Sequence, residues 1–198
     1  MRYLLRLSAM LGLLALTIGC GATTPTSVPT AAPAPTNPIT PTEVPPASQS
    51  FTLTSSVFAP SGAIPAKYAC SDQNISPPLA WGEPPANTQS FALIVEDPDA
   101  GGYVHWVIYN IPATARGLAE ALPQDELLPD GSSQGQGSDG AQGYFGPCPP
   151  SGNHRYTFTL YALDTQLQLE PPIRRLKVAT AMKDHILAQT SLEGTYQK

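Results

Sequence analysis

Charged side chains are scarce in this chain of 198 residues: Asp, Glu, Lys and Arg make up 13% of it, about half the share usual in soluble proteins. The charge that is present is mostly acidic, and the formal net charge is −5. A nucleic-acid-binding protein needs a basic face, and a polybasic membrane patch needs an excess of Lys and Arg. The composition therefore argues against both kinds of binding.

Several enzyme signatures are absent as well. The chain has no G-x-S-x-G motif, and Ser151 lies in a loop rich in Pro and Gly, so a serine hydrolase is not expected. The His and Cys residues lack the close spacing that is typical of metal sites, and the sequence contains no internal repeat. We therefore expect a protein that uses no cofactor and is not an enzyme.

The N-terminus carries a targeting segment. Arg2 and Arg6 precede the apolar stretch LSAMLGLLALTIG, which is too short to span a bilayer stably and is typical of a secretory signal. It ends in LTIGC, which resembles a bacterial lipoprotein processing site, although Thr17 occupies a position that is usually aliphatic. We expect residues 1–20 to be a lipoprotein-type signal peptide, with Cys20 acylated and the protein anchored outside the cytoplasm. A plain secretory signal and an uncleaved anchor are the alternatives.

Residues 21–50 are dominated by Thr, Pro, Ala and Ser, and Glu43 is their only charged residue. Such a composition cannot bury a core and favours a disordered, extended tether. The remaining residues, 51–198, carry 14 acidic and 8 basic side chains. Their number is sufficient for one globular domain with a single core.

Four segments of this domain are predicted to be β-strands, because they alternate apolar and polar residues or form short apolar runs. They are FTLTSSVF (51–58), SFALIVE (90–96), HWVIYNI (105–111) and RYTFTLYAL (155–163). The last of them places Tyr156, Phe158, Leu160 and Ala162 on one face. Long loops rich in Gly, Ser and Pro separate the strands.

One segment, KVATAMKDHILAQ (177–189), suggests a helix. Met182 and Ile186 lie one helical turn apart, and Thr180 could cap its start. His185 would then lie on this helix as a surface or capping residue. Strands first and one helix late predict a mainly β domain, either a β-sandwich or a β-rich α+β domain.

Two loops place chemically active residues at the starts of strands. In DPDAGGYVHW (97–106) two carboxylates flank a proline, and His105 begins the next strand. Taken alone, this pattern is explained by a turn whose carboxylates accept hydrogen bonds from backbone N–H groups. The second loop, GYFGPCPPSGNHRY (143–156), also leads to a histidine, His154, at a strand start. If both strands belong to one core, the loops can meet and form a site for a small polar or anionic ligand.

Taken together, these motifs resemble the phosphatidylethanolamine-binding protein family, and above all its bacterial Raf kinase inhibitor-like branch. The residues that carry the resemblance are DPDA…HW…YNIP and GPCPPSGNHRYTFTLYALD, supported by YACSDQNISPPLAW and AMKDHILAQTSLEGTY. The likeness covers Phe51 to Lys198. It implies two antiparallel sheets with a C-terminal helix, and a small pocket for phosphate-type anions, including phospholipid head groups.

The resemblance also implies which residues form this pocket: Asp97, Asp99, His105, Gly146, Pro147, Pro149, His154 and Tyr156. Protonated histidines, the Tyr156 hydroxyl and glycine amides would donate hydrogen bonds to a phosphate, and Asp99 would orient a histidine. An ethanolamine-type amino group would offer the carboxylates a cation. Two departures from the family pattern affect the site: Gly101 replaces a proline in the rim, and the changed motif CSDQN leaves the role of Asp72 open.

Cys70 and Cys148 are the only cysteines besides Cys20. The resemblance brings the segments around them towards the same end of the molecule, and the expected compartment is oxidising. We therefore expect a Cys70–Cys148 disulfide; two separate buried thiols are the alternative.

A binding module for phosphate-bearing ligands, or for phosphorylated or acidic partner groups, is the function that we favour from the sequence. The first alternative is an inhibitor of a protease or another enzyme that acts through its loop surface. The second is a metal-dependent enzyme that uses His105, His154 and an Asp. A homodimer is compatible with the resemblance.

Overall fold

The computed structural model describes residues 50–198, so the expected signal peptide, Cys20 and nearly all of the expected tether lie outside the described residues. Nine strands, two short 3-10 helices and one α-helix are found in residues 50–198. In chain order they are β1 (Leu53–Thr54), β2 (Gly62–Ala63), η1 (Ala66–Tyr68), β3 (Leu79–Trp81), β4 (Ser90–Asp97), η2 (Pro98–Ala100), β5 (Tyr103–Pro112), β6 (Gly117–Leu118), β7 (Ser133–Gln134), β8 (Asn153–Leu163), α1 (Arg175–Met182) and β9 (Ile186–Gln197).

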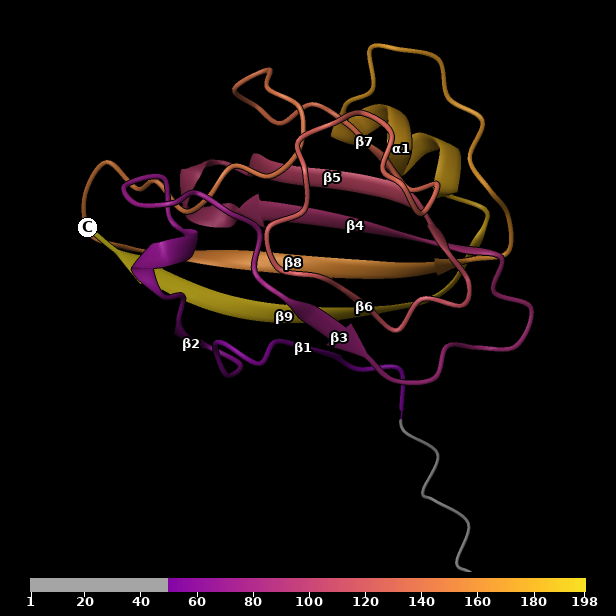
Figure 1. Cartoon of the computed structure of the whole chain (residues 1–198), viewed down its shortest axis with the longest axis horizontal. Helices are drawn as coiled ribbons and strands as arrows, with labels where there is room; N and C mark the ends of the chain where they lie inside the picture. Colours follow the sequence, from indigo (N-terminus) through magenta and orange to yellow (C-terminus); the bar gives the residue numbers. More distant parts are fainter. Residues whose placement is uncertain (1–49) are drawn as a thin grey trace, which may run out of the picture. The chain divides into compact units, whose positions relative to one another are not determined.

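The strands form two sheets. The larger has the order β2-β9-β8-β4-β5-β7, and the smaller has the order β1-β3-β6. Figure 1 shows the four long strands β5, β4, β8 and β9 side by side. Neighbouring strands are antiparallel except for the short pair β2 and β9, which is parallel. The predicted mainly β fold with two sheets and one helix is confirmed.

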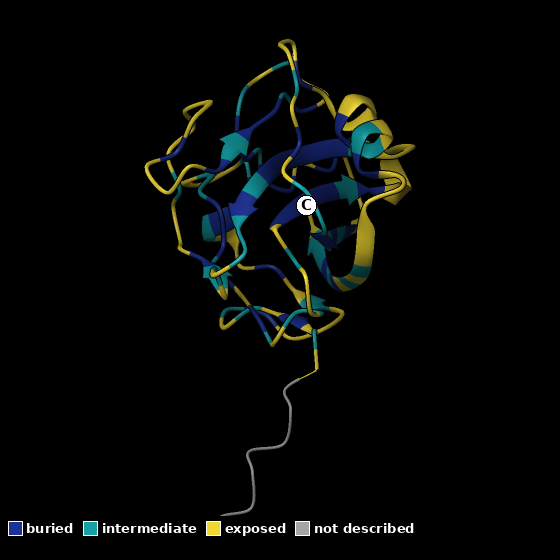
Figure 2. Cartoon of the chain, turned by 90° about the vertical axis from the view of Figure 1, so that its right-hand side faces the viewer, coloured by how far each residue is buried: buried dark blue, intermediate teal, exposed yellow. Residues whose placement is uncertain are grey.

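Strand β4 is buried on both faces, which explains why its residues 91–95 are all apolar. Successive side chains of a strand point to opposite faces. Phe91 and Leu93 accordingly belong to the core between the two sheets, whereas Ala92 and Ile94 belong to a second core that includes Met182 of α1. The smaller sheet therefore covers one face of the larger sheet and α1 covers the other. Figure 2 shows these buried strands in the middle of the domain, with exposed loops around them.

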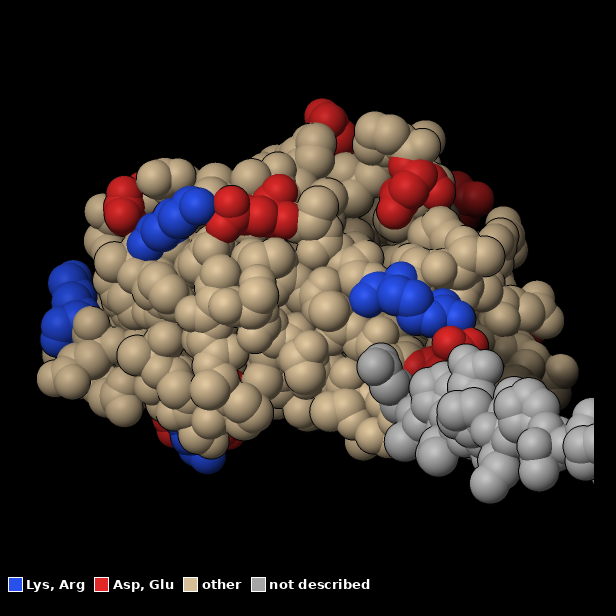
Figure 3. Space-filling view, turned by 60° about the horizontal axis from the view of Figure 1, so that its bottom comes forward, with Lys and Arg blue, Asp and Glu red and all other residues tan. Residues whose placement is uncertain are grey.

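The predicted strands differ in how far they extend. β4, β5 and β8 match their apolar or alternating sequences, and the alternate residues Tyr156, Phe158, Leu160 and Ala162 are all buried in the core between the sheets. Of the strand expected over residues 51–58, only Leu53 and Thr54 are paired. Charged side chains are few on the face of the molecule that Figure 3 shows.

The helix is shorter and lies earlier than predicted. α1 spans Arg175–Met182, so Thr180 lies near its end and does not cap its start. Ile186 begins strand β9, which pairs with β8 along almost its whole length. This long-range pairing outweighs the helical spacing of Met182 and Ile186, because local propensity is worth only tenths of a kcal/mol per residue, at most about 0.7 for ordinary residues. His185 lies between the two elements, at the surface, and is hydrogen-bonded to Asp164.

Candidate functional site

A pocket of about 340 Å³ lies where β4 ends and β5 begins. It is lined by residues from the turn after β4, the start of β5 and the loop before β8: Asp97, Ala100, Tyr103, His105, Phe145, Cys148 and Pro150. The two loops singled out from the sequence therefore meet at one site. His154 and Tyr156 lie beside this lining through their contacts with Asp97 and His105.

Asp97 is the buried acidic residue of the site, with 2% of its surface exposed. One carboxylate oxygen accepts a hydrogen bond from the Ala100 backbone amide at 3.0 Å and so caps η2. The other lies 2.7 Å from Nδ1 of His154. Because a carboxylate only accepts, Nδ1 of His154 carries the hydrogen of this bond. Asp97 therefore fixes the orientation of His154 across the β4–β8 pair.

His105 is turned towards the pocket by an irregularity in the β4–β5 pairing. Val95 is opposite Trp106 and Glu96 is opposite Val104, so His105 has no Cα partner in β4. Such β-bulges re-aim side chains and are common next to functional sites. The imidazole stacks on the Phe145 ring, at a centroid distance of 5.8 Å, and meets the Tyr156 ring edge-on.

The protonation of His105 follows from its surroundings. Burial lowers its pKa, although the Phe145 carbonyl and the charge of Asp97 act in the opposite direction. The neutral imidazole is therefore favoured, and the expectation that a protonated His105 donates to a phosphate is not supported. Nδ1 lies 2.8 Å from the Phe145 carbonyl oxygen and must donate to it. Nε2 is left as a hydrogen-bond acceptor.

The Tyr156 hydroxyl is buried and has no hydrogen-bond partner. It lies next to Asp97 and the Cys148 backbone, two groups that line the pocket, without forming a hydrogen bond of normal geometry to either. Burial raises the pKa of Tyr156, and the negative charge of Asp97 raises it further. The hydroxyl therefore stays protonated and can donate a hydrogen bond at the site.

Asp99 does not orient a histidine, contrary to the expectation from the sequence. Its carboxylate accepts two bonds from the Arg155 guanidinium, at 2.7 and 3.1 Å, and one from the Arg155 backbone amide at 2.8 Å. These bonds lower the pKa of Asp99 to about 2. Asp97 has the orienting role instead, and Asp99 ties the turn after β4 to the start of β8. Asp99 is absent from the pocket lining.

The rim after η2 depends on two glycines. Gly101 and Gly102 have φ values of 68° and 80°, a left-handed conformation that suits glycine. Proline fixes φ near about −65°, so the proline of the family pattern could not occupy position 101 in this conformation. Gly101 therefore permits a turn that proline would not, and hydrogen bonds to Asp97 and Asp99 brace this turn.

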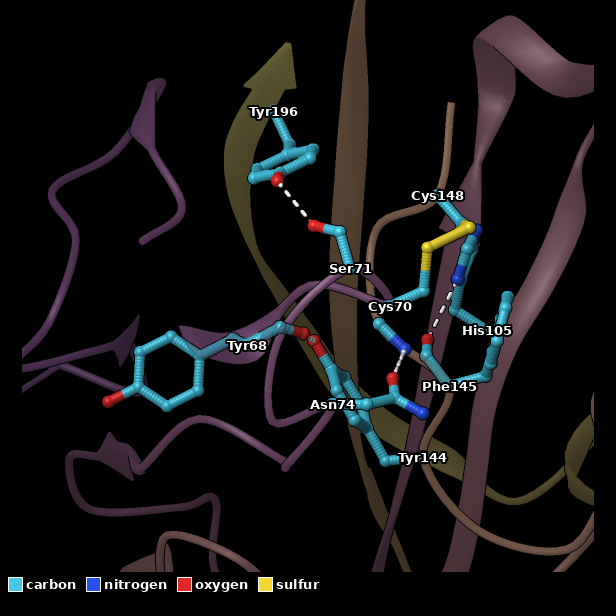
Figure 4. The surroundings of a disulfide bond; sticks show 10 residues. Tyr68, Cys70, Ser71, Asn74, His105, Tyr144, Phe145, Cys148 and Tyr196 are labelled. Atoms are coloured by element: carbon cyan, nitrogen blue, oxygen red, sulfur yellow. Dashed lines mark hydrogen bonds between the residues drawn. A yellow bond between two sulfur atoms is a disulfide. The ribbon is translucent and has the colours of Figure 1, made fainter. Parts of the chain in front are cut away.

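The pocket wall from Gly146 to Pro150 is held against the segment around Cys70, as Figure 4 shows. The Gly146 amide donates to Oδ1 of Asn74 at 2.7 Å, and the Cys70 amide donates to the Pro147 carbonyl at 3.1 Å. A Cβ atom at position 146 would overlap the Tyr68 carbonyl oxygen. Gly146 is thus needed for close packing. Its amide, which the sequence suggested as a donor for a ligand, is already used by Asn74.

Cys70 and Cys148 form a disulfide with a Cα–Cα distance of 5.4 Å, the pairing expected from the sequence. Cys148 also lines the pocket, so the covalent bond joins the pocket wall directly to the neighbouring segment. Asp72, two residues after Cys70, is exposed. It takes no part in the pocket lining.

Several site residues could not be found from the sequence. Tyr103 and Phe145 line the pocket, but a single aromatic residue beside a strand looks like any core residue. Asn74 was present in a motif that supported the resemblance, yet nothing in its spacing indicated that it holds the Gly146 amide. Pro147 and Pro149 belong to the wall segment but are absent from the pocket lining.

No group of three or more His, Cys, Asp or Glu side chains within residues 50–198 is placed to hold a metal ion. None of the helices in this part of the chain is long and apolar enough to cross a membrane.

Comparisons with known proteins agree on one family. Residues 54–197 match the family model described as phosphatidylethanolamine-binding protein. A "UPF0098 protein" of Methanothermobacter thermautotrophicus is 50% identical over 148 residues, covering 74% of this chain and 98% of the relative. A Mycobacterium tuberculosis protein named "Putative lipoprotein LppC" is 40% identical over 156 residues, covering 77% of this chain and 75% of the relative.

Two solved structures have the same fold. The crystal structure of CT736 from Chlamydia trachomatis, titled a "Putative PhosphatidylEthanolamine-Binding Protein (PEBP) Homolog", has a TM-score of 0.70 and 39% identity, covering 76% of this chain and 99% of that one. YbcL from E. coli, described as a new member of the mammalian PEBP family, has a TM-score of 0.70 and 30% identity, covering 75% and 98%.

Proposed function

The chain belongs to the phosphatidylethanolamine-binding protein family, and from this premise and the geometry of the pocket we propose that its domain is a binding module for a small phosphate-bearing ligand. The ligand class comprises phosphate monoesters and phospholipid head groups of the phosphoethanolamine type. The ligand would occupy the pocket between the turn after β4 and the 145–150 loop.

The observation that carries this proposal is the Tyr156 hydroxyl, which is buried and protonated beside the pocket and makes no well-aligned hydrogen bond to its neighbours, the Asp97 carboxylate and the Cys148 backbone. A buried polar group without a hydrogen bond costs about 1–3 kcal/mol. An acceptor oxygen of a bound ligand would remove this cost. Phosphate supplies several such oxygens in a small volume, which matches a pocket of about 340 Å³.

The remaining pocket groups narrow the chemistry of the ligand. Nε2 of His105 and the carboxylate of Asp97 are acceptors, and Asp97 carries negative charge in a buried position. A fully ionised phosphate would be repelled here, whereas a ligand that brings its own donors would be bound. A monoprotonated phosphate offers one hydroxyl, and an ethanolamine group adds an ammonium. These features support a zwitterionic head group over a bare dianion.

The placement of the domain in the cell is part of the same proposal. Acylation of Cys20 and a tether over residues 21–50 would hold the binding domain outside the cytoplasm at the membrane surface, where phospholipid head groups are present. The name of the mycobacterial relative, which includes the word lipoprotein, supports this placement.

The experiment that tests the pocket is calorimetric titration with phosphoethanolamine, inorganic phosphate and ethanolamine. We expect phosphoethanolamine to bind most tightly. His154→Ala and His105→Ala should each weaken binding by at least tenfold, because losing a hydrogen bond to a charged group costs about 1.5–3 kcal/mol. His105 is buried, so thermal unfolding of each variant should first show that the fold is retained at the temperature of the titration.

His185→Ala is the matched control, since this histidine is also bonded to an aspartate but lies at the surface away from the pocket. It should bind the ligand as the unchanged protein does. Equal affinities for His105→Ala, His154→Ala and the unchanged protein would show that the pocket is not the binding site.

A further inference from the structure

The basic residues of the domain are concentrated in one short segment. Arg174, Arg175, Lys177 and Lys183 are four of the eight Lys and Arg residues in 51–198, although these residues carry 14 acidic groups. Arg175 is paired with Glu96 at 3.0 Å, whereas the other three form no salt bridge within the described part of the chain. All four charged residues of the segment 174–183 are thus basic, although Glu170 and Asp184 flank this segment.

Large apolar side chains are exposed at the same place. Within residues 50–198, four large hydrophobic residues are exposed, and three of them lie on α1 or at the start of β9: Leu176 at 71%, and Ile186 and Leu187 at 38% each. In Figure 2 the exposed turns of α1 and the exposed start of β9 are on the same side of the domain. Exposed apolar groups rimmed by polar ones mark interaction surfaces.

An open hollow of about 640 Å³ adjoins the helix and is lined by Leu169, Pro172, Leu176 and Ala181 together with Arg174 and Lys177. This surface is separate from the ligand pocket, with which it shares no lining residue. We call the combination of α1, this hollow and the residues Ile186 and Leu187 the α1 face. It combines unpaired cations with accessible apolar side chains, whereas the domain as a whole is acidic.

We propose that the α1 face is the surface on which the domain rests on an anionic lipid bilayer. A bilayer places negative head groups directly above hydrocarbon, which matches cations flanking an exposed leucine on a short helix. The long side chains of Arg174 and Lys177 can keep their charges among the head groups while Leu176 enters the apolar layer. An acyl group on Cys20 would keep the α1 face within reach of the membrane.

Vesicle binding by the unlipidated chain of residues 21–198 tests the proposal. The relatives from Methanothermobacter and Chlamydia consist almost entirely of this domain, so we expect it to fold without a lipid anchor, which circular dichroism of the purified chain should establish first. At low ionic strength the protein should sediment with vesicles of phosphatidylcholine and phosphatidylglycerol mixed in equal amounts. It should not sediment with vesicles of phosphatidylcholine alone, and added salt should release it.

Matched variants assign the binding to the α1 face. Arg174→Gln with Lys177→Gln should lower partitioning about thirtyfold, at roughly fivefold for each cation, whereas Arg116→Gln with Lys198→Gln removes the same charges elsewhere and should change partitioning little. Leu176→Ser should lower it by about tenfold. Leu127→Ser, at a leucine that is 67% exposed and lies in another segment, should have no effect.

Several results would overturn the proposal. One is that the unchanged chain does not bind the anionic vesicles, and another is that both pairs of variants behave alike. Release from the vesicles by excess soluble phosphoethanolamine would show that the ligand pocket holds the lipid. Binding to an acidic polypeptide such as polyglutamate, without binding to vesicles, would show that the α1 face contacts a protein partner instead.

Discussion

At the residue scale, neighbouring groups determine which ring nitrogen of each pocket histidine carries the hydrogen. The Phe145 carbonyl holds Nδ1–H of His105, and the Asp97 carboxylate holds Nδ1–H of His154. Each imidazole therefore has a defined orientation before any ligand arrives. Preorganised groups bind more tightly, because the ligand does not bear the cost of ordering them.

The Asp99–Arg155 pair gives a prediction about pH. Because the pKa of Asp99 is lowered to about 2 in the folded protein, its contribution to stability is present above the ordinary value of about 3.9 and is lost as the pH falls through 2. Carboxyl chemical shifts followed by NMR should give a midpoint near 2. Arg155→Gln should move that midpoint up towards about 4.

Glu120 provides the control for this titration. Its pKa is lowered by Tyr68 and Lys67, which have no contact with Arg155, so its midpoint should be the same in the protein and in Arg155→Gln. An Asp99 midpoint near the ordinary value in the unchanged protein would contradict the bidentate ion pair.

The sequence identified the histidines of the site but not the pairing of its acids. His105 and His154 stood out because both open apolar strands. Asp97 is the last residue of β4, whereas Asp99 lies beyond the strand in η2. These positions in the fold decide which partner each carboxylate meets. The bulge that turns His105 towards the pocket also lacks a local signal, because it depends on the pairing with β4.

At the scale of elements, the 145–150 loop has little regular structure of its own and is held by neighbours. The Cys70–Cys148 disulfide joins residues that are 78 positions apart, and Asn74 holds the Gly146 amide. Replacing both cysteines by serine should lower the free energy of unfolding by about 4–5 kcal/mol, because the unfolded chain regains the entropy that the cross-link removed. Denaturant unfolding measures this loss.

Thiol titration of the unreduced, denatured chain of residues 21–198 provides a second measurement of the same bond. No free thiol should be found. Two free thiols per chain would disprove the bridge. A reducing agent should destabilise the unchanged protein but should have no effect on the variant with both cysteines replaced.

Strands that are buried along most of their length were predictable from the sequence. Strands whose conformation depends on pairing with a segment distant in sequence were not. SFALIVE is apolar because β4 has a core on each face, so its strand was evident from composition alone. ILAQTSLEGTYQ alternates only weakly, because β9 is largely exposed on one face and its first residues are exposed. Its apolar start therefore fits the end of the predicted helix equally well, and the pairing with β8 determines its conformation.

At the scale of the whole molecule, the expected tether of residues 21–50 is dominated by Thr, Pro, Ala and Ser. Deleting Gly21 to Ser50 should therefore change the melting temperature of the domain by less than about 2 °C, since a segment of this composition has too little apolar surface to contribute to a core. Differential scanning calorimetry of the chains 21–198 and 51–198 makes the comparison. A large fall in the melting temperature would show that the segment packs on the domain.

The position of β9 has a consequence for biosynthesis. A ribosome delivers the chain from its N-terminus, so β9, which pairs with all 11 residues of β8, is made after the other described elements. The larger sheet therefore cannot be completed before β9 has been synthesised. A premature stop after His185 would leave the whole edge of β8 open, and open strand edges template aggregation.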